Sequence, residues 1–424
     1  MKYTEDHNCS RSNKKISANS GTTKTRSYDQ NVISYIRTKT DREIQLKPGY
    51  FHTHILLMLI LCLLLSACSH SASTDPSAPI RPDSQSVQLK DTNTPSIKQN
   101  MPSSSTGFED KDHRIRIGFS MDTLVEERWK KDRELFRQAA EQRGADVIIQ
   151  SANGDDARQI VQAETMIRQG IDVLVIVPHN AEAAAAIIQK AHQAGIKVLS
   201  YDRLVKNADV DLYVSFDNEE VGRLQARAII KQVPKGKYVY IGGANTDNNA
   251  HLFKKGVFDI LQPLIERGDI QVVYDQWSKD WQPAYAKVNM QQALQANRNK
   301  VDAVIVANDA TAGGAIEALA EKGMAGQIPV AGQDGDLAAA RRIVKGTQTM
   351  TVYKPLQQLA GTTADMAIRL ARGEKIDTRQ KVNNGKTEVP AVLLQPIAVD
   401  VTNLDQTMIR DHFHSREEIY GQVQ

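Results

Sequence analysis

From residue 114 onward, short apolar runs alternate with longer segments in which apolar residues recur at helical spacing. The short runs have the length of strands and the longer segments have the length of helices. Ten strands are predicted, at 115–120, 146–150, 173–178, 197–202, 213–216, 238–242, 271–276, 303–307, 329–332 and 350–353. Eight helices are predicted, at 128–143, 156–169, 182–194, 219–231, 253–267, 284–296, 311–321 and 356–371. Alternation of this kind is typical of βαβ units, so the sequence predicts parallel sheets and the α/β class.

The same pattern indicates how the chain divides. Segments 172–178 and 302–307 are almost continuous in Val, Ile and Ala, as in strands that are covered on both faces. Four glycines stand where a predicted helix should end, namely Gly144, Gly170, Gly195 and Gly323. This many strands suits two doubly wound lobes better than one sheet. The first half-unit is predicted from 114 to about 216 and the second from about 217 to 350. The tail adds a helix and an apolar segment at 392–399, which the pattern leaves free to join either half.

An apolar run at 55–66 precedes all of this and ends in Ser66, Ala67 and Cys68. Basic residues come before it, at Arg37, Lys39, Arg42 and Lys47. The run is shorter than the roughly 20 residues that a membrane span needs, which favours a signal segment over a transmembrane helix or an accidental run. Leu-Ser-Ala-Cys resembles the lipobox of bacterial lipoproteins. That resemblance implies a leader at 1–67, a lipid on Cys68 and an extracytoplasmic chain anchored to the cell membrane.

Residues 68–112 are rich in Ser, Thr and Pro, and we expect a flexible linker there because such a segment buries little apolar surface. The cysteines are Cys9, Cys62 and Cys68. Processing at Cys68 would leave only that one, so no disulfide, thiol nucleophile or cysteine metal site is expected in the mature chain.

The composition is that of a globular protein, with 41% hydrophobic and 24% charged residues. A net charge of +3 gives no sign of a nucleic-acid partner. There is no complete Walker or G-x-G-x-x-G motif, and we expect no cofactor and no metal. The pair His412 and His414 has a spacing that metals use, but two histidines near a terminus are more often surface residues.

Polar and aromatic residues follow the predicted strands, where ligands bind in open α/β sheets. They are Asp122, Arg128, Trp129, Asp202, Arg203, Asp247, Asn248, Asn249, Trp277, Asp280, Trp281, Asn308, Asp309, Asp334, Asp336 and Lys354. Flat aromatic rings suit the C–H faces of a sugar, and planar polar groups suit its hydroxyls. The set therefore favours a carbohydrate site.

Each member of this set also has a simpler interpretation. Asn248, Asp309 and Asp336 are placed to cap helices. Arg203 could form an ion pair at the surface, and Lys354 could be a solvated charge. Trp129 and Trp281 could pack in the core.

Many short segments, in one order, are similar to the periplasmic binding proteins of the ribose/galactose/xylose group. They are Glu127-Arg-Trp-Lys-Lys-Asp132, Gln150-Ser-Ala-Asn-Gly154, Tyr201-Asp-Arg203, Ser215-Phe-Asp-Asn218, Asp247-Asn-Asn-Ala250, Asp275-Gln-Trp277, Trp281, Asn308-Asp-Ala-Thr-Ala-Gly-Gly314, Gly332-Gln-Asp334, Gly346-Thr-Gln-Thr-Met-Thr-Val-Tyr-Lys-Pro355 and Asn383-Asn-Gly385. The resemblance covers about 114–413. One departure is Gly335, where the family leads us to expect Ala and where glycine is expected only to loosen the loop.

The resemblance implies two Rossmann-like lobes joined by a three-strand hinge, with crossings near 217, 351–354 and 389–394. The N-terminal lobe would hold 114–216 plus about 355–388, and the C-terminal lobe 217–350 plus about 395–420. The ligand would be a monosaccharide, D-xylose first. Its hydrogen-bonding residues would be Arg128, Asp202, Arg203, Asn249, Asn308, Asp334 and Lys354. Trp129 and Trp281 would cover its two faces.

The implied function is sugar capture for the permease of an ABC importer, by a monomer and without catalysis. A sugar-sensing receptor for a membrane signalling partner, or a binding protein for another pentose or hexose, remains an alternative. A DNA-binding regulator of this fold would need a helix-turn-helix before Arg114, where the signal and linker stand. An enzyme could use Asp202 and Asp334 as an acid/base pair, but no nucleophile, metal cluster or cofactor motif supports that.

Overall fold

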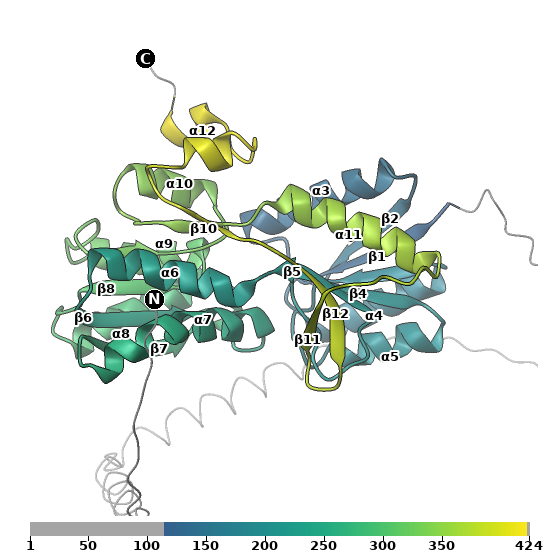
Figure 1. Cartoon of the computed structure of the whole chain (residues 1–424), viewed down its shortest axis with the longest axis horizontal. Coiled ribbons are helices and arrows are strands. Elements are labelled where there is room, and N and C mark those ends of the chain that lie inside the picture. The colour runs from purple at the N-terminus through teal and green to yellow at the C-terminus, as the bar shows by residue number, and fades with distance from the viewer. Residues whose placement is uncertain (1–113, 422–424) are drawn as a thin grey trace, which may run out of the picture. The chain divides into compact units, whose positions relative to one another are not determined.

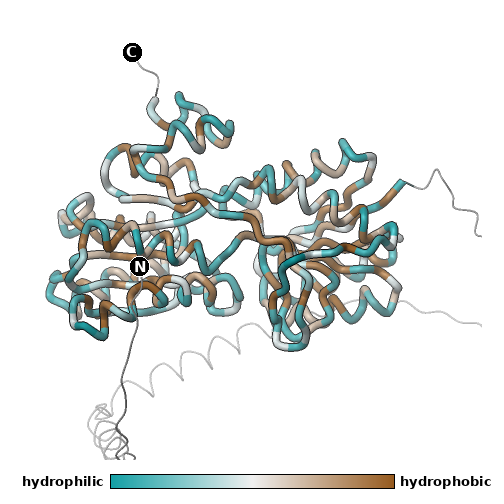
Figure 2. Tube along the Cα trace, viewed as in Figure 1, coloured by the Kyte–Doolittle hydropathy of each residue, from teal (hydrophilic) through white to brown (hydrophobic). Residues whose placement is uncertain are grey.

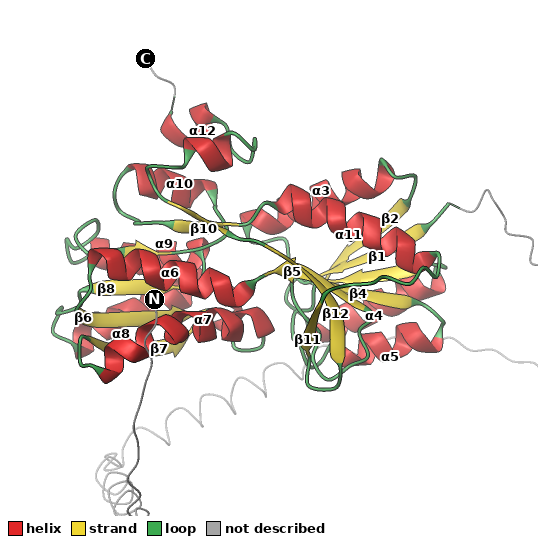
Figure 3. Cartoon of the chain, viewed as in Figure 1, coloured by secondary structure: helices red, strands yellow, loops and turns green. Residues whose placement is uncertain are grey.

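The computed structural model describes residues 114–421, which are coloured in Figure 1. The predicted leader, the lipidated Cys68 and the linker to residue 112 lie outside the described residues. Within 114–421, no helix combines the length and the apolar character that crossing a bilayer requires. The described chain is of the α/β class, with strands covered by helices on both sides (Figure 3).

A seven-stranded sheet forms the core of what we call the first lobe. Its strands lie in the order β11 (Gln380–Asn383), β12 (Glu388–Leu394), β5 (Leu212–Phe216), β4 (Lys197–Tyr201), β3 (Val173–Ile176), β1 (Arg116–Met121) and β2 (Asp146–Ser151). All neighbours are parallel except the hairpin of β11 and β12. Helices α3 (Glu127–Glu141) and α11 (Leu356–Ala371) pack on one face, and α4 (Asp156–Arg168) and α5 (Ala185–Gln193) on the other.

The continuous apolar pattern of β3 follows from these two helix layers. Val173 and Val175 belong to the core cluster under α3 and α11, whereas Leu174 and Ile176 belong to the cluster under α4 and α5. Because successive side chains of a strand point to opposite faces, a sheet covered on both faces needs apolar residues at every position. Figure 2 shows hydrophobic positions along the strands and hydrophilic ones along the outer loops.

The second lobe is built on a four-stranded parallel sheet. Its order is β7 (Ile270–Trp277), β6 (Gly236–Gly242), β8 (Ala303–Val306) and β9 (Val330–Ala331). Helices α6 (Asn218–Gln232) and α7 (Asn248–Glu266) cover one face, and α8 (Pro283–Ala296) and α9 (Asp309–Ala320) the other. An antiparallel pair, β10 (Thr351–Tyr353) and β13 (Ile397–Val399), joins α10 (Leu337–Val344) and α12 (Arg416–Tyr420) beside this sheet.

The chain passes between the lobes three times. It leaves the first lobe after β5, returns between β10 and α11, and leaves again between β12 and β13 (Figure 1). The apolar tail segment at 392–399, which the sequence pattern allows in either half, is shared by both. Its first part lies in β12, which pairs with β5, and its last part lies in β13, which pairs with β10.

All ten predicted strands and all eight predicted helices are present, with ends that shift by a few residues. The four helix-ending glycines adopt the left-handed conformation that such ends need, with φ between 68° and 80°. The elements without a prediction are short or late in the chain: α10, β11, α12, the 3₁₀ turn at Lys279–Trp281, the π-helical turn at Asp405–Ile409, and the strands β12 and β13, which the pattern gave only as an apolar segment.

Helices α6 and α7 approach so closely that two glycines form their contact. A Cβ on Gly222 would lie 2.1 Å from the carbonyl oxygen of Phe253, and one on Gly256 would lie 1.9 Å from that of Glu219. No side chain fits at either position. Because α7 begins with residues of the pocket described below, this contact also sets the position of that helix end.

We expect Gly256→Ala to lower the free energy of unfolding by about 1–3 kcal/mol, because the added methyl forces the two backbones apart. Gly361→Ala is the matched control. Gly361 also lies inside a helix, but its Cβ would meet only Arg143 Nη2, at 3.9 Å. That variant should gain up to about 1 kcal/mol from helix propensity. Urea unfolding of both variants measures the two effects, and an equal loss in both would contradict the close-contact explanation.

Candidate functional site

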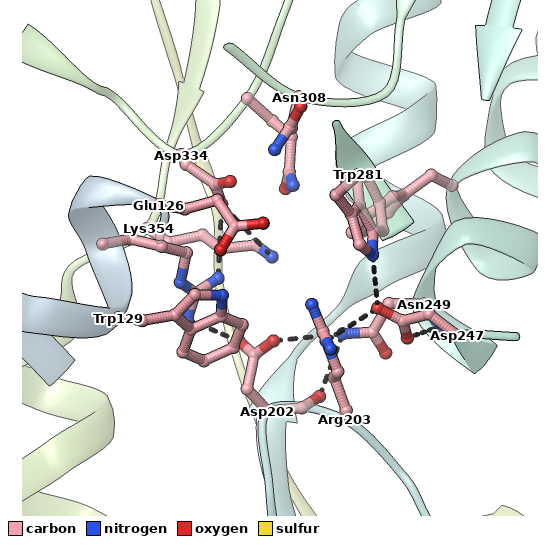
Figure 4. A pocket seen from close by; sticks show the side chains of 13 residues that line it. Glu126, Trp129, Asp202, Arg203, Asp247, Asn249, Trp281, Asn308, Asp334 and Lys354 are labelled. Atoms are coloured by element: carbon pink, nitrogen blue, oxygen red, sulfur yellow. Dashed lines mark hydrogen bonds and ion pairs between the residues drawn. The ribbon is translucent and has the colours of Figure 1, made fainter. Parts of the chain in front are cut away.

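A pocket lies between the two lobes, at the carboxyl ends of their parallel strands (Figure 4). Its cavity volume is about 20 Å³. All nine predicted ligand residues line it: Arg128, Trp129, Asp202, Arg203, Asn249, Trp281, Asn308, Asp334 and Lys354. Four further residues outside the predicted ligand set also line it: Asp247 and Gln333, which follow predicted strands, and Glu126 and Phe253, which the sequence did not single out. The nine residues are thus brought together from seven separate places in the chain.

Each of the nine predicted residues stands after a strand, at a helix start or in the turn that follows a strand. Asp202 and Arg203 follow β4, Arg128 and Trp129 begin α3, Asn249 begins α7, Trp281 ends the turn after β7, and Asn308, Asp334 and Lys354 follow β8, β9 and β10. Three of them have left-handed backbones, with φ of 58° at Asp202, 57° at Trp281 and 101° at Asp334. Such conformations cost about 1–3 kcal/mol each and persist where surrounding contacts fix them.

Asp202 shows how the surroundings hold one of these backbones. Its N–H donates to the carbonyl of Val214 at 2.8 Å. Its own carbonyl accepts from the hydroxyls of Tyr213 and Ser215, at 2.9 and 2.7 Å, and from the Asn249 amide at 3.1 Å. The last donor belongs to the second lobe, so the strained residue also joins the two lobes.

Arg128 is the centre of the first charge network. Its guanidinium is 4% exposed and binds three carboxylates: Asp132 at 3.0 Å, Asp202 at 2.9 Å and Asp334 at 3.2 Å. Burial alone would raise the pKa of Asp202, but Arg128 and Lys354 outweigh it, so this pKa lies below its usual value. Burial does prevail at Asp132 and raises its pKa to about 6, although Arg128 and the Tyr201 hydroxyl oppose the rise.

Arg203 organises a second network on the other side of the pocket. Its Nη1 donates to Asp122 at 2.6 Å, and its Nε lies 2.7 Å from Asp247 Oδ2. The far oxygen of Asp122 lies 2.9 Å from His179 Nδ1. Burial lowers the pKa of Arg203, but the attraction of Asp247 and Asp122 raises it by more. The net pKa lies above its usual value, so the guanidinium is charged at all accessible pH values.

Asp247 both caps a helix and holds a side chain of the pocket. Its Oδ1 accepts from the Asn249 N–H at 2.9 Å and so caps α7, while its Oδ2 accepts from Trp281 Nε1 at 3.1 Å. Asn308 likewise caps α9, through the Thr311 N–H at 3.0 Å, and lines the pocket.

The capping interpretation is wrong for the three residues to which the sequence pattern assigned it. Asn248 and Asp309 are the first residues inside their helices, and Asp336 makes no side-chain capping bond. Asp309 instead accepts from the Gly335 N–H at 2.9 Å and from the Thr351 hydroxyl at 2.6 Å.

Lys354 is not a solvated charge. It is 1% exposed, and among the described residues its Nζ makes no hydrogen bond. Its Nζ lies 3.9 Å from Asp334 Oδ1 and 5.0 Å from the centre of the Phe253 ring. Burial lowers the pKa of Lys354, against the attraction of Asp202. Two acceptors of the pocket, Glu126 Oε2 and Gln333 Oε1, are also buried without a hydrogen-bond partner in the described part of the chain.

The two tryptophans face the pocket from opposite sides in Figure 4. Trp129 is 3% exposed and has the Arg128 guanidinium 4.2 Å from its ring centre; Trp281 is 6% exposed. Each also belongs to the hydrophobic core cluster of its lobe. Both tryptophans therefore pack in a core, as the simpler interpretation expected, and line the pocket as well. Glu126, Arg203 and Trp281 border an outer cavity as well, and therefore stand between the pocket and the entrance of the cleft.

Among residues 114–421, no group of His, Cys, Asp and Glu is arranged to hold a metal ion. His412 is exposed, as expected, but the surface interpretation is wrong for His414, which is 3% exposed. The site therefore offers donors, acceptors and two flat apolar rings, which suits a small hydroxylated ring.

Comparison with known proteins agrees with this geometry. Residues 117–375 match the model of the periplasmic binding protein domain. The chain is 54% identical to the D-xylose-binding periplasmic protein of Haemophilus influenzae over 306 residues, covering 72% of this chain and 92% of that protein. It is 49% identical to the protein of the same name from Escherichia coli, with the same coverage.

A solved structure is also similar. It is a carbohydrate transporter solute-binding protein of Chloroflexus aurantiacus in complex with D-glucose, with a TM-score of 0.68 and 31% identity, covering 72% of this chain and 98% of that one.

Proposed function

Because this chain belongs to the family of periplasmic binding protein domains, we propose that it captures D-xylose outside the cytoplasm and delivers it to an ABC importer. The two D-xylose-binding relatives, at 54% and 49% identity, support this sugar. Because the similar Chloroflexus protein is in complex with D-glucose, a hexose is the alternative ligand.

The observation that carries the proposal is the set of unsatisfied polar atoms between two indoles. Lys354 Nζ is a donor, and Glu126 Oε2 and Gln333 Oε1 are acceptors. A buried polar group without a partner costs about 1–3 kcal/mol. A sugar hydroxyl both donates and accepts, so one pyranose can serve both kinds of atom while its C–H faces contact Trp129 and Trp281.

The charge state of Asp202 does not suit the acid of an Asp202–Asp334 acid/base pair. A glycosidase-like mechanism needs one carboxyl group that keeps its proton near neutral pH. The pKa of Asp202 is instead lowered, because Arg128 and Lys354 outweigh its burial. Both Asp202 and Asp334 are occupied by Arg128, which suits fixed hydrogen-bond acceptors rather than a proton donor.

Capture requires the lobes to move. Asp202 and Arg128 of the first lobe bind Asn249 and Asp334 of the second, and these contacts close over the pocket. A sugar can enter only when they part, and it adds contacts to both lobes when they meet again. The three chain crossings are the natural hinge for this motion.

The location we propose is the outer face of the cell membrane, with a lipid on Cys68 and the segment to residue 112 as a flexible leash. A tether of this kind raises the local concentration of the receptor near its permease. We propose a monomer, since two lobes of one chain complete the pocket. A membrane sensor as a second partner would use the same sugar-dependent closure and remains the alternative.

Isothermal titration should show D-xylose binding more tightly than D-glucose, D-ribose and L-arabinose. Intrinsic fluorescence should change on binding, because two of the three Trp residues line the pocket. Chromatography of the sugar after incubation should return it unchanged. Tighter binding of one of the other sugars would overturn the assignment of xylose, and loss of sugar during incubation would overturn binding without turnover.

Lys354→Met should leave the ligand-free protein at least as stable, because it removes a buried ammonium that makes no hydrogen bond in the described structure. It should also weaken xylose binding by about tenfold or more, which corresponds to about 1.4 kcal/mol. A purely structural lysine would give the opposite pattern, with lower stability and unchanged affinity. Lys386→Met, at an exposed lysine paired with Asp209, is the matched control and should change neither. Thermal unfolding and titration measure the two effects.

Cys68→Ala should move the full-length protein from the membrane fraction to the soluble fraction of the expressing bacterium, since the lipid would have no attachment point. Ser66→Thr, beside the same site, is a control that should stay in the membrane fraction. Retention of the Cys68→Ala variant on membranes would contradict the lipid anchor but would leave the sugar site untouched.

A further inference from the structure

The C-terminal segment from Leu404 to Tyr420 packs behind the pocket and reaches both lobes. Leu404, Met408 and Ile419 join Tyr353 and residues of α10 in one core cluster, which belongs to the second lobe. In Figure 1 this segment, including α12, lies beside α10 and extends toward the start of α3. Its contact with α3 is made by Phe413 and His414.

His414 is held as a neutral imidazole by its two neighbours. Its Nε2 lies 2.8 Å from the Gly335 carbonyl oxygen, which can only accept, so Nε2 carries the proton. Its Nδ1 lies 3.1 Å from Lys131 Nζ, which can only donate, so Nδ1 must accept. Lys131 also donates to the Phe413 carbonyl at 2.8 Å and lies 4.0 Å from the centre of its ring.

Both partners of His414 are next to pocket residues. Gly335 follows Asp334, and Lys131 is on α3 less than one turn after Arg128 and Trp129. Arg128 and Asp334 bind each other across the pocket at 3.2 Å. His414 therefore links α3, through Lys131, to the loop after β9, through Gly335. The ion pair of Arg128 and Asp334 links the same helix to the same loop directly.

The C-terminal segment packs closely against the loop after β9 because residue 335 of that loop is a glycine. A Cβ at this residue would lie 3.2 Å from Met408, 3.3 Å from Tyr353 and 3.5 Å from Phe413, and its φ of 74° is one that glycine accepts without strain. Its N–H is fixed by Asp309 at 2.9 Å. The loop is thus tightly held at the residue where sequence reasoning expected only a loosening.

We propose that residues 404–420 form a clasp in which Lys131 and His414 position Arg128 and Asp334 for the sugar, and that the clasp is complete only while His414 is neutral. The inference deepens the proposed function, since its main readout is sugar affinity. His414 and Lys131 are positioning residues, because neither lines the pocket.

The charges around His414 decide the direction of the pH effect. Lys131 on α3 is the nearest cation, and a protonated His414 would both repel it and lose the Nδ1 acceptor. Glu127 Oε1 on α3, at 3.8 Å, and Glu418 on α12 attract the imidazolium in part. On α10, Arg341 is engaged by the carbonyl of Glu418. Burial first and Lys131 second lower the pKa of His414 below 6.5. The clasped form therefore binds fewer protons, and clasping weakens as pH falls below about 6.5.

The test is the ratio of the xylose dissociation constants at pH 5 and pH 7.5, measured by titration on the full-length chain. The parent protein should bind at least about threefold more weakly at pH 5. His414→Gln keeps an amide donor for Gly335 but cannot titrate, and Lys131→Met removes the repelled cation. Both should bring the ratio well below the parent value, and the remainder would come from other groups that titrate in this range, such as Asp132 beside Arg128.

Two controls isolate His414. His192→Gln changes a histidine that pairs with Asp211 far along the first lobe and should keep the parent ratio. His179→Gln changes the histidine that contacts Asp122 of the pocket network and should also keep most of it. A pH ratio that survives in His414→Gln, or that disappears in His179→Gln instead, would overturn the clasp.

A ligand-free measurement separates this proposal from the proposed function. In a double-mutant cycle of Lys131→Met and His414→Gln, shifts of the urea midpoint should be non-additive at pH 7.5 and additive at pH 5. If xylose does not bind at any pH, the function is wrong but this cycle still decides the clasp. Additive shifts at pH 7.5 would overturn it even where xylose binds.

Discussion

The structure depends above all on one buried guanidinium. Arg128 is almost fully withdrawn from water, and three carboxylates from two lobes surround it. Taking a charge out of water costs several kcal/mol, so the position of Arg128 is acceptable only with well-placed partners. Asp132 comes from its own helix, Asp202 from the loop after β4 and Asp334 from the second lobe. One ionic requirement thus fixes the start of α3, a strained loop and the approach of the lobes at once.

The fold around this centre was largely predictable because it follows from local rules. A buried parallel strand such as β3 needs apolar residues on both faces, and the glycines after the helices need φ values that other residues avoid. The site was predictable for a related reason. Parallel strands deliver their following residues to one edge of their sheet, so Asp202 after β4 and Asn308 after β8 could be assigned to the ligand edges of their lobes before any distance was known. Lys354 follows β10, which pairs antiparallel with β13, so this rule does not account for its place in the pocket.

What the sequence could not supply is the set of contacts that have no local signature. Glu126 precedes α3 like many surface acids, and only the structure places it against the pocket. Asp247 stands in the polar set after the strands, but only the structure shows that one of its oxygens caps α7 and the other accepts from Trp281. His414 lies 79 residues from Gly335 in the chain, so its burial depends on tertiary packing that periodicity does not report. For Asp247 a signal existed, because a residue that both follows a strand and precedes a helix can serve a site and a cap together.

The distribution of partners around the two arginines explains how such a charged pocket can still open. Arg128 takes Asp132 and Asp202 from its own lobe and only Asp334 from the other. Arg203 takes Asp122 from its own lobe and Asp247 from the other. Parting the lobes would therefore leave each guanidinium with a carboxylate, and would expose Asp334 and Asp247 to water, which solvates them well. Opening therefore breaks only some of the ion pairs of each arginine. This limits the free-energy difference between the open and the closed arrangement of the lobes. A ligand that adds contacts to both lobes can then shift the population strongly, because it needs to supply only the difference between them.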